Sequence, residues 1–566
     1  MTTQRHSMST LLVAALIAVG LAPLSRAQQG TVGSFQKIGP GSGGFFGALD
    51  PGDEYAYSMC SLGDLDGDGV TDIAVGAPWD DDGGTDRGAV WIHFLKADGT
   101  VKAFQKISDT QGSFTGTLTD TDWFGWSVCA VGDVNHDGVT DIAVGAIQTD
   151  DGAVDDGAVW LLFMNTSGTV KSSHKISFSS GGLGFVLLDF SWFGSSVAPL
   201  GDIDGDGVVD LAVGSHGDSD TGTFVGAVYA LHLKTDGTVK SAIKINELSG
   251  GFTGALDDGD EFGWAMAPLG DMDGNGTGDL AVTAELDDDG GQDRGAVWVL
   301  FLQPGATIVK SSTKISDTEG GFTGVLDNKD HFGRSIAALG DFDGNGAGDL
   351  CVGAYQDDDG GSNKGAVWNL FLNANGSVAS EQKISATEGG FSGLLDLEDK
   401  FGGSVAGLGD LNGDGVRDVA VGASLDDDGG DDAGALWVLF LNGGTWTNLG
   451  FALAGTGGLP AFTGSGTLAA LTTVKLNLSN AKPNSPAVMF VSTSSNPTPF
   501  KGGLLVPVPA LALIGLATSP TGSIPLSFTW PSGIPAGTSV VLQYAIQDPL
   551  AVKGVALSNA LKGSAP

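Results

Sequence analysis

The chain of 566 residues has few cysteines and few basic side chains. Its three cysteines, Cys60, Cys129 and Cys351, lie in apolar strand-like runs, which favours buried free thiols over a disulfide framework. A bridge between Cys60 and Cys129 is the alternative. Lysine and arginine number 26 against 67 acidic residues, so the net charge is −41. A surface this acidic repels a duplex, so we expect no nucleic-acid partner.

Long apolar runs are also missing after residue 27, which predicts no membrane span. The first 27 residues differ, because Arg5 and His6 precede the run TLLVAALIAVGLAPL and SRA precedes Gln28. This order predicts a signal peptide at 1–27, cleaved after about Ala27. We therefore expect a protein that is secreted or held at the cell surface.

Glycine is abundant, with 93 residues, and much of it belongs to one repeated motif. The segment GDLDGDGVTD at 63–72 recurs as GDVNHDGVTD, GDIDGDGVVD, GDMDGNGTGD, GDFDGNGAGD and GDLNGDGVRD, with leading aspartates 69 or 70 residues apart. Each unit also holds a DLAVGA-type run, a DDDGG-type turn, a GAVWxLFL-type run and a closing QKIS-type run. Four short strands per unit predict the blade of a β-propeller.

The units predict an all-β fold, a six-bladed β-propeller at 28–445, with seven blades as the alternative. QKI-type strands precede the first unit, at Lys37-Ile38, but none follows the sixth. We expect the N-terminal strand to complete the last blade and close the ring. GAVW-type strands are apolar on both faces, as strands between two layers are. Their aromatic residues are therefore interpreted as inter-blade core: Trp91, Trp160, Tyr229, Trp298, Trp368 and Trp437.

The carboxylates of the repeated motif have the spacing D-x-D-x-D-G-x-x-D. Positions 1, 3, 5 and 9 offer side-chain oxygens and position 7 a backbone carbonyl, a set that suits Ca²⁺. Solvated Asx turns are the structural alternative, and no helices flank the loops as in an EF-hand. We expect about six ions, one per blade. The predicted ligands are Asp64, Asp66, Asp68, Val70 and Asp72; Asp133, Asn135, Asp137, Val139 and Asp141; Asp202, Asp204, Asp206, Val208 and Asp210; Asp271, Asp273, Asn275, Thr277 and Asp279; Asp341, Asp343, Asn345, Ala347 and Asp349; and Asp410, Asn412, Asp414, Val416 and Asp418.

The segment FGWSVCAVGDVNHDGVTDIAVGA at 124–146 resembles an FG-GAP repeat, the blade unit of the integrin α-subunit propeller, in the form that exported bacterial proteins carry. The similarity covers about residues 36–442. Unit one departs from it with EYAYS in place of FGxS, and we count six units where integrins have seven. The resemblance implies that the calcium loops join strands 1 and 2 on one face, and that the 2-3 and 4-1 loops form the opposite, ligand-facing side.

That second face is predicted to be acidic, because it gathers the DDDGG-type turns. A solvated rim is one interpretation, and a second cation site or a surface for basic partners is the other. Residues that break the repeat there are candidate contacts with an extracellular protein or glycan: Trp79, Trp123, His216, Phe224 and His331. The sequence thus favours a secreted, calcium-binding, non-enzymatic adhesion or binding protein.

Catalytic motifs are absent, so we expect no catalytic residues. The seven histidines are scattered, and neither H-E-x-x-H nor a convincing G-x-S-x-G occurs. A propeller-type polysaccharide lyase or glycosidase is the alternative. Its best location is the third unit, where SHGDSDTGTF replaces the DDDGG turn and His216 is the distinctive group.

Composition changes after about residue 445. The last 121 residues hold five lysines and one aspartate, Asp548, without glutamate or arginine, a net charge of +4. Short apolar runs separated by proline and glycine predict a small β-sandwich at 446–566. Attachment to a surface and simple capping of the propeller are the two hypotheses for its role.

Overall fold

The computed structural model describes residues 29–305, 307–443, 446–465, 468, 473–531, 534 and 538–564. The predicted signal peptide and its cleavage site lie outside these residues. The chain divides into two compact units. The larger comprises residues 31–412 and 417–441, and the smaller is formed mainly by residues 442–566. Within the described residues, no helix is long and apolar enough to cross a membrane.

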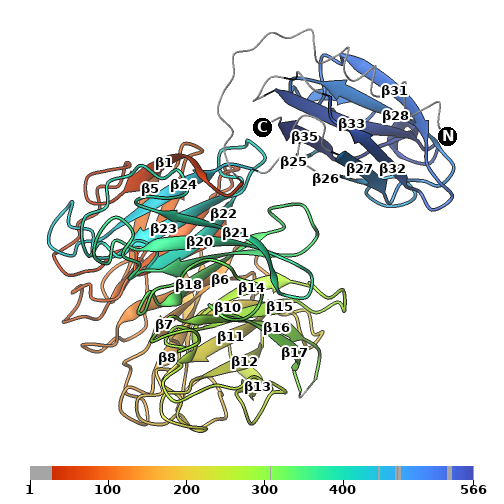
Figure 1. Ribbon diagram of the computed structural model, residues 1–566. Helices are drawn as coiled ribbons and strands as arrows, with labels where there is room; N and C mark the ends of the chain where they lie inside the picture. Colours follow the sequence, from red (N-terminus) through yellow and green to blue (C-terminus); the bar gives the residue numbers. More distant parts are fainter. Residues whose placement is uncertain are drawn as a thin grey trace. The chain divides into compact units, whose positions relative to one another are not determined.

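The larger unit consists of six four-stranded antiparallel sheets, the blades of a propeller (Figure 1). Blades one to six are β2(Ser58–Gly63), β3(Asp72–Ala77), β4(Ala89–Leu95) and β5(Val101–Ile107); β6(Phe124–Gly132), β7(Asp141–Ala146), β8(Ala158–Met164) and β9(Val170–Ser177); β10(Val197–Gly201), β11(Asp210–Ser215), β12(Ala227–Leu233) and β13(Val239–Ile245); β14(Phe262–Gly270), β15(Asp279–Ala284), β16(Ala296–Leu302) and β17(Val309–Ile315); β18(Phe332–Gly340), β19(Asp349–Ala354), β20(Ala366–Leu372) and β21(Val378–Ser385); and β22(Ser404–Gly409), β23(Asp418–Ala423), β24(Ala435–Leu441) and β1(Val32–Ile38).

The ring closes as predicted, because the N-terminal strand β1 pairs with β24 and completes blade six. The first strands of successive blades contact one another around the whole ring, including β2 against β22. Hydrogen bonds follow the same circle: Ser58 Oγ donates to the Gly125 carbonyl of the next blade at 2.8 Å, and Ser404 Oγ of blade six donates to the Ala56 carbonyl of blade one. No seventh four-stranded sheet occurs among the described residues.

The core lies between the blades, as the two-sided apolar strands predict. One cluster joins Ile38, Leu436 and Val438 of blade six to Phe45 and Trp91 of blade one. Trp91 is 4% exposed, and the equivalent tryptophans of blades two, four, five and six are buried in the same way. The interpretation of these aromatics as inter-blade core is therefore confirmed. The three cysteines are free, as predicted; Cys129 and Cys351 are buried, and Cys60 is half-buried.

The Phe-Gly pair that starts each repeat has a steric cause. Phe124 is fully buried between blades, and Gly125 has a φ of 99°, where a Cβ would lie 2.4 Å from the Ala89 carbonyl oxygen. Glycine adopts that conformation without strain. Blade one carries Tyr55-Ala56 instead, and Ala56 keeps the left-handed conformation with a φ of 69°. The departure in sequence therefore preserves the local structure.

The smaller unit is a β-sandwich, as predicted. A three-stranded sheet (β26-β27-β32) and a larger sheet (β25-β35-β33-β28-β31, with β34 beside β33) enclose one apolar core that includes Phe462, Leu476, Met489, Trp530 and Leu542. Its elements are β25(Trp446–Gly450), β26(Ala461–Ser465), β27(Thr473–Ser479), β28(Pro486–Ser492), β29(Thr498–Phe500), β30(Gly503–Leu505), β31(Ala512–Ala517), β32(Ile524–Thr529), β33(Ser539–Gln547), η1(Val552–Gly554), β34(Val555–Leu557) and β35(Ala560–Ser564).

Candidate functional site

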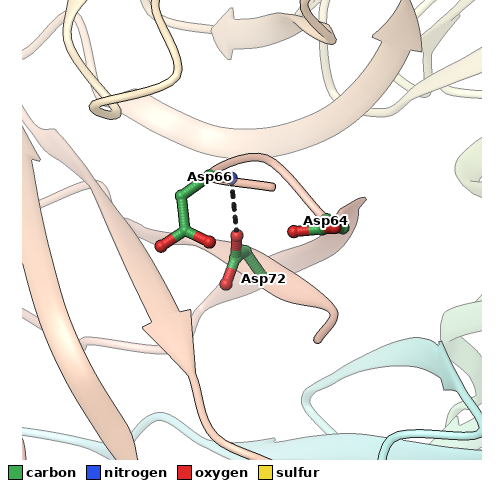
Figure 2. A group of neighbouring side chains, drawn as sticks. All are labelled: Asp64, Asp66 and Asp72. Atoms are coloured by element: carbon green, nitrogen blue, oxygen red, sulfur yellow. Dashed lines mark hydrogen bonds between the residues drawn. The ribbon is translucent and has the colours of Figure 1, made fainter. Parts of the chain in front are cut away.

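The predicted metal ligands lie in the six loops between the first and second strand of each blade. Figure 2 shows the first of these loops, where carboxylate oxygens of Asp64, Asp66 and Asp72 lie within 4.8 Å of one another. Three other loops gather three carboxylates in this way: Asp202, Asp204 and Asp206; Asp271, Asp273 and Asp279; and Asp341, Asp343 and Asp349.

In the loops 133–141 and 410–418, no such group of three carboxylates is found among the described residues. Both loops have asparagine at the third position, Asn135 and Asn412, where the other four have aspartate. An amide oxygen is still a donor for a hard cation. These two loops therefore keep an oxygen donor at every position. They have three carboxylates, as loops 271–279 and 341–349 do with asparagine at the fifth position, whereas loops 64–72 and 202–210 have four.

The loops are shaped by hydrogen bonds from their own backbone. Asp64 Oδ2 accepts from the Gly69 amide at 2.8 Å. The ninth-position Asp72 is fully buried, and its two oxygens accept from the Leu65 and Leu95 amides, each at 3.0 Å. Burial raises the pKa of Asp72 to about 6. Because carboxylate oxygens have two lone pairs each, this aspartate can tie the loop to the third strand and also face a metal.

Four of these loops carry a lysine on their carboxylates. Lys102 Nζ lies 2.7 Å from Asp66 Oδ2 and also contacts Asp68. Lys171, Lys240 and Lys310 pair in the same way with position 3, position 5 or both. All four lysines stand second in the outer strand of their blade. These lysines were not predicted from the sequence, although they recur as Val-Lys in TVK or IVK.

In five of the six blades, a lysine pairs with two aspartates of the acidic turn between the second and third strands. Lys106 Nζ lies 2.6 Å from Asp80 and 2.8 Å from Asp82, beside the Trp91 ring. The equivalent lysines, Lys37, Lys244, Lys314 and Lys383, bind the equivalent aspartate pairs. These ammonium groups occupy the place that a second cation would take. The paired turns are therefore neither a simple solvated rim nor an open cation site.

A buried carboxyl beside these turns gives a prediction on pH. Burial, together with the charge of Asp357, raises the pKa of Asp330 to about 7, although its Oδ2 accepts from the Asp327 amide at 2.8 Å. Asp330 stays protonated up to about pH 7 in the folded state but only up to about pH 4 in the unfolded state. Its contribution to the free energy of unfolding therefore falls as the pH rises from about 4 to about 7.

Asp330→Asn removes the charge and keeps an oxygen that accepts from the Asp327 amide. At pH 8 we expect the variant to be more stable than the wild type by about 1 kcal/mol after solvent screening. The difference should disappear below pH 4. Urea unfolding at several pH values measures it, and an equal difference at every pH would contradict the assignment.

The 2-3 and 4-1 loops surround one end of the central channel. A cavity of about 200 Å³ is lined by all six first strands, and a second one of about 90 Å³ lies at the residues that begin these strands. Three positions of each repeat define what we call the channel mouth: the residue before Phe-Gly, the residue after it, which lines the smaller cavity in every blade, and the residue after the second strand. In blade order they are Glu54, Trp123, Trp192, Glu261, His331 and Lys400; Tyr57, Trp126, Ser195, Trp264, Arg334 and Gly403; and Pro78, Ile147, His216, Glu285, Tyr355 and Ser424.

Four large side chains meet across the channel mouth. The Tyr57 and Trp126 rings lie 4.6 Å apart, and Trp126 meets Trp264 at 6.4 Å. The Arg334 guanidinium lies 4.7 Å from the Trp264 ring and 5.0 Å from the Tyr57 ring. Its Nη1 is also 3.4 Å from Glu285 Oε2. Arg334 is thus held by aromatic faces and a carboxylate of the chain itself.

The five predicted contact residues all lie in aromatic or charged groups at this mouth. Trp123 stacks on Trp126 at 5.4 Å and meets Trp79 at 5.3 Å. Phe224 lies 5.6 Å from Trp192, whose ring is 4.9 Å from His216. His331 Nδ1 lies 3.2 Å from Glu285 Oε1. Tyr57, Trp126, Trp264, Arg334 and Glu285 were missed by sequence reasoning. The residue after Phe-Gly varies from blade to blade, and this variation would have identified the first four.

The two histidines differ from the tryptophans in exposure. His216 is 4% exposed, and burial lowers its pKa to about 3, so it is neutral at physiological pH. Trp79, Trp123 and Phe224 are half-buried and present part of each ring to solvent. Contact with a ligand therefore suits these aromatic rings better than the two histidines.

Comparison with protein families finds FG-GAP repeats at residues 55–93, 124–162, 193–231, 262–300 and 401–439. Integrin alpha-11 of Homo sapiens is 33% identical over 171 residues, 29% of this chain and 13% of that protein. Integrin alpha pat-2 of Caenorhabditis briggsae is 29% identical over 252 residues, 41% of this chain and 18% of that protein. The chain thus spans under a fifth of the length of these relatives.

Two solved structures have a weak overall similarity to this chain. The V. cholerae biofilm matrix protein Bap1 is 12% identical with a TM-score of 0.25, over 96% of this chain and 71% of that chain. Rhamnogalacturonan lyase YesW is 12% identical with a TM-score of 0.26, over 95% of this chain and 91% of that chain. At these TM-scores the likeness supports no functional argument.

Proposed function

Because the propeller is built of FG-GAP repeats similar to those of integrin α subunits, we propose that this chain is a secreted, calcium-binding protein that binds an extracellular protein or glycan without transforming it. One observation carries the proposal. The repeats keep their residues through strands and turns but differ from one another at the three positions that ring the channel mouth. A rigid ring with varied loop residues at one end suits recognition.

Calcium is proposed from the chemistry of the first-to-second-strand loops. Their donors are all oxygens, and in four loops three carboxylates converge within 4.8 Å. Carboxylates, amide oxygens and carbonyls are the ligands of a hard cation of this size. Two carboxylates 4 Å apart repel by about 4 kcal/mol at an effective dielectric of 20, so a bound cation would relieve strain in each loop.

Binding is proposed to use the aromatic groups of the channel mouth. We expect Trp123→Ala and Phe224→Ala to weaken partner binding at least tenfold and to leave the melting temperature nearly unchanged, because both rings are half-buried at the surface. Phe104→Ala is the control, since Phe104 is 37% exposed on the outer strand β5. The partner used in this assay is first identified by screening an array of glycans and extracellular proteins with and without chelator. Normal binding by both variants, with binding lost on removal of residues 446–566, would make the propeller a spacer.

The enzyme alternative has one specific observation in its favour. His331, Glu285 and Arg334 form the one mixed-charge contact group at the mouth among the described residues, and it occurs in a single blade pair. We expect no product from a panel of polysaccharides. Turnover that His331→Ala abolishes would instead favour a lyase or glycosidase.

A further inference from the structure

The lysines on the calcium loops divide the six blades into two classes. Lys102, Lys171, Lys240 and Lys310 each lie within 2.8 Å of a carboxylate at loop position 3 or 5. The same place in the outer strand holds Ala379 in blade five and Gly33 in blade six. The first four blades along the chain have a lysine at this strand position, and the last two do not.

The loop of blade five contrasts most clearly with the lysine-bearing loops, because it gathers carboxylates without a lysine. Oxygens of Asp341, Asp343 and Asp349 converge as those of Asp271, Asp273 and Asp279 do in blade four. Among the described residues, no ion pair reaches any of these three carboxylates. Arg417 comes close, because its guanidinium lies beside Gly340, the residue before Asp341, but it forms no ion pair with the loop. Loop 271–279 of blade four has the same donor types at positions 1, 3, 5 and 9 as loop 341–349, including an asparagine at position 5, and it carries Lys310. These two loops thus share their carboxylates and differ in the lysine.

We propose that Lys102, Lys171, Lys240 and Lys310 are built-in counter-cations that grade the calcium affinity of the loops. The inference rests on the calcium binding proposed above. Without calcium, each lysine neutralises carboxylates that would otherwise repel one another. With calcium, the ammonium group lies near a divalent ion and opposes it. Loop 341–349 therefore fills at lower calcium than loop 271–279, and each of the four lysines raises the calcium concentration that its own loop needs.

The size of the effect follows from Coulomb's law. An ammonium group bound to a ligand carboxylate lies roughly 6 Å from the ion, and in a solvent-like dielectric it weakens binding by about tenfold. The same lysine lowers the repulsion within the empty loop, so the first four blades lose less on removal of calcium. The propeller would then respond to calcium over a wide range of concentration instead of at a single threshold.

The test measures each loop separately in the whole chain. Hydrogen–deuterium exchange with peptide-level mass spectrometry, at buffered free calcium from 1 µM to 10 mM, reports a midpoint for each loop peptide, because the loop amides bond to the ligating carboxylates. The wild-type midpoint for 341–349 should be about tenfold lower than that for 271–279, which has the same donor set and Lys310. Lys102→Met should lower the 64–72 midpoint about tenfold and leave the other loops unchanged. Ala379→Lys, at an exposed position, should raise the 341–349 midpoint.

Lys96→Met is the matched control, because Lys96 is exposed at the end of the same blade and forms no ion pair among the described residues. It should leave every midpoint in place. Equal wild-type midpoints, or an unchanged 64–72 midpoint in Lys102→Met, would overturn the role of the lysines while calcium binding stands. If no loop peptide is protected from hydrogen–deuterium exchange at 10 mM calcium, calcium binding itself is overturned, and the lysine proposal with it.

Discussion

Removal of calcium is expected to lower the melting temperature of the propeller by about 10 °C. With an average Kd near 10⁻⁴ M and about 1 mM calcium, a site adds on average about 1.4 kcal/mol to the free energy of unfolding, and six sites add about 8 kcal/mol. This amount rivals the net stability of a whole domain. Spread over the roughly 400 residues of the propeller, it corresponds to a shift of about 10 °C.

Differential scanning calorimetry with and without a chelator measures this shift. Chelator saturated beforehand with calcium is the control for effects of the chelator itself, and magnesium at the same concentration tests for a general effect of divalent charge. A melting curve that the chelator leaves unchanged would contradict the calcium assignment for all six loops. A shift restored by magnesium alone would mean that the sites do not select an ion of calcium size.

The fold could be predicted because its determinants are local and repeated. Strand length, apolar pattern and turn residues recur about every 69 residues, so one blade indicates the others. Ring closure could also be predicted, since one QKI-type strand was left over at the N-terminus and missing at the end. Even the break at Tyr55-Ala56 followed a local rule, because Ala56 adopts the left-handed conformation that glycine has in the other blades.

The channel mouth could be predicted only in part. Trp79 and Trp123 were found because they break the repeat within a loop. Arg334 was not, because its partners Tyr57 and Trp264 lie 277 and 70 positions away and meet it only through the closed ring. The acidic turns were also misjudged in isolation. Lys106 is placed beside Asp80 by the pairing of strands β4 and β5, which the turn sequence alone does not contain.

The largest structural effect is expected from removing strand β1. A chain that begins at Gly39 loses the pairing of Val32–Ile38 with β24. It also loses Ile38, which is fully buried, and Phe35, whose ring lies 5.2 Å from Phe391 and 5.4 Å from Trp437. The apolar side chains alone account for about 5 kcal/mol. The exposed edge of β24, with the sequence ALWVLFL, is moreover a template for pairing between chains.

We therefore expect the shortened chain to aggregate or to melt at a clearly lower temperature. Size-exclusion chromatography with light scattering and a thermal melt measure the two effects. A chain that begins at Gly30 is the matched control, because it keeps all of β1. A synthetic peptide of residues 30–40, added in trans, should restore part of the lost stability by pairing with β24. If the chain that begins at Gly39 stays monomeric and melts like the control, the N-terminal strand does not hold the ring closed, and blade six is stable with three strands.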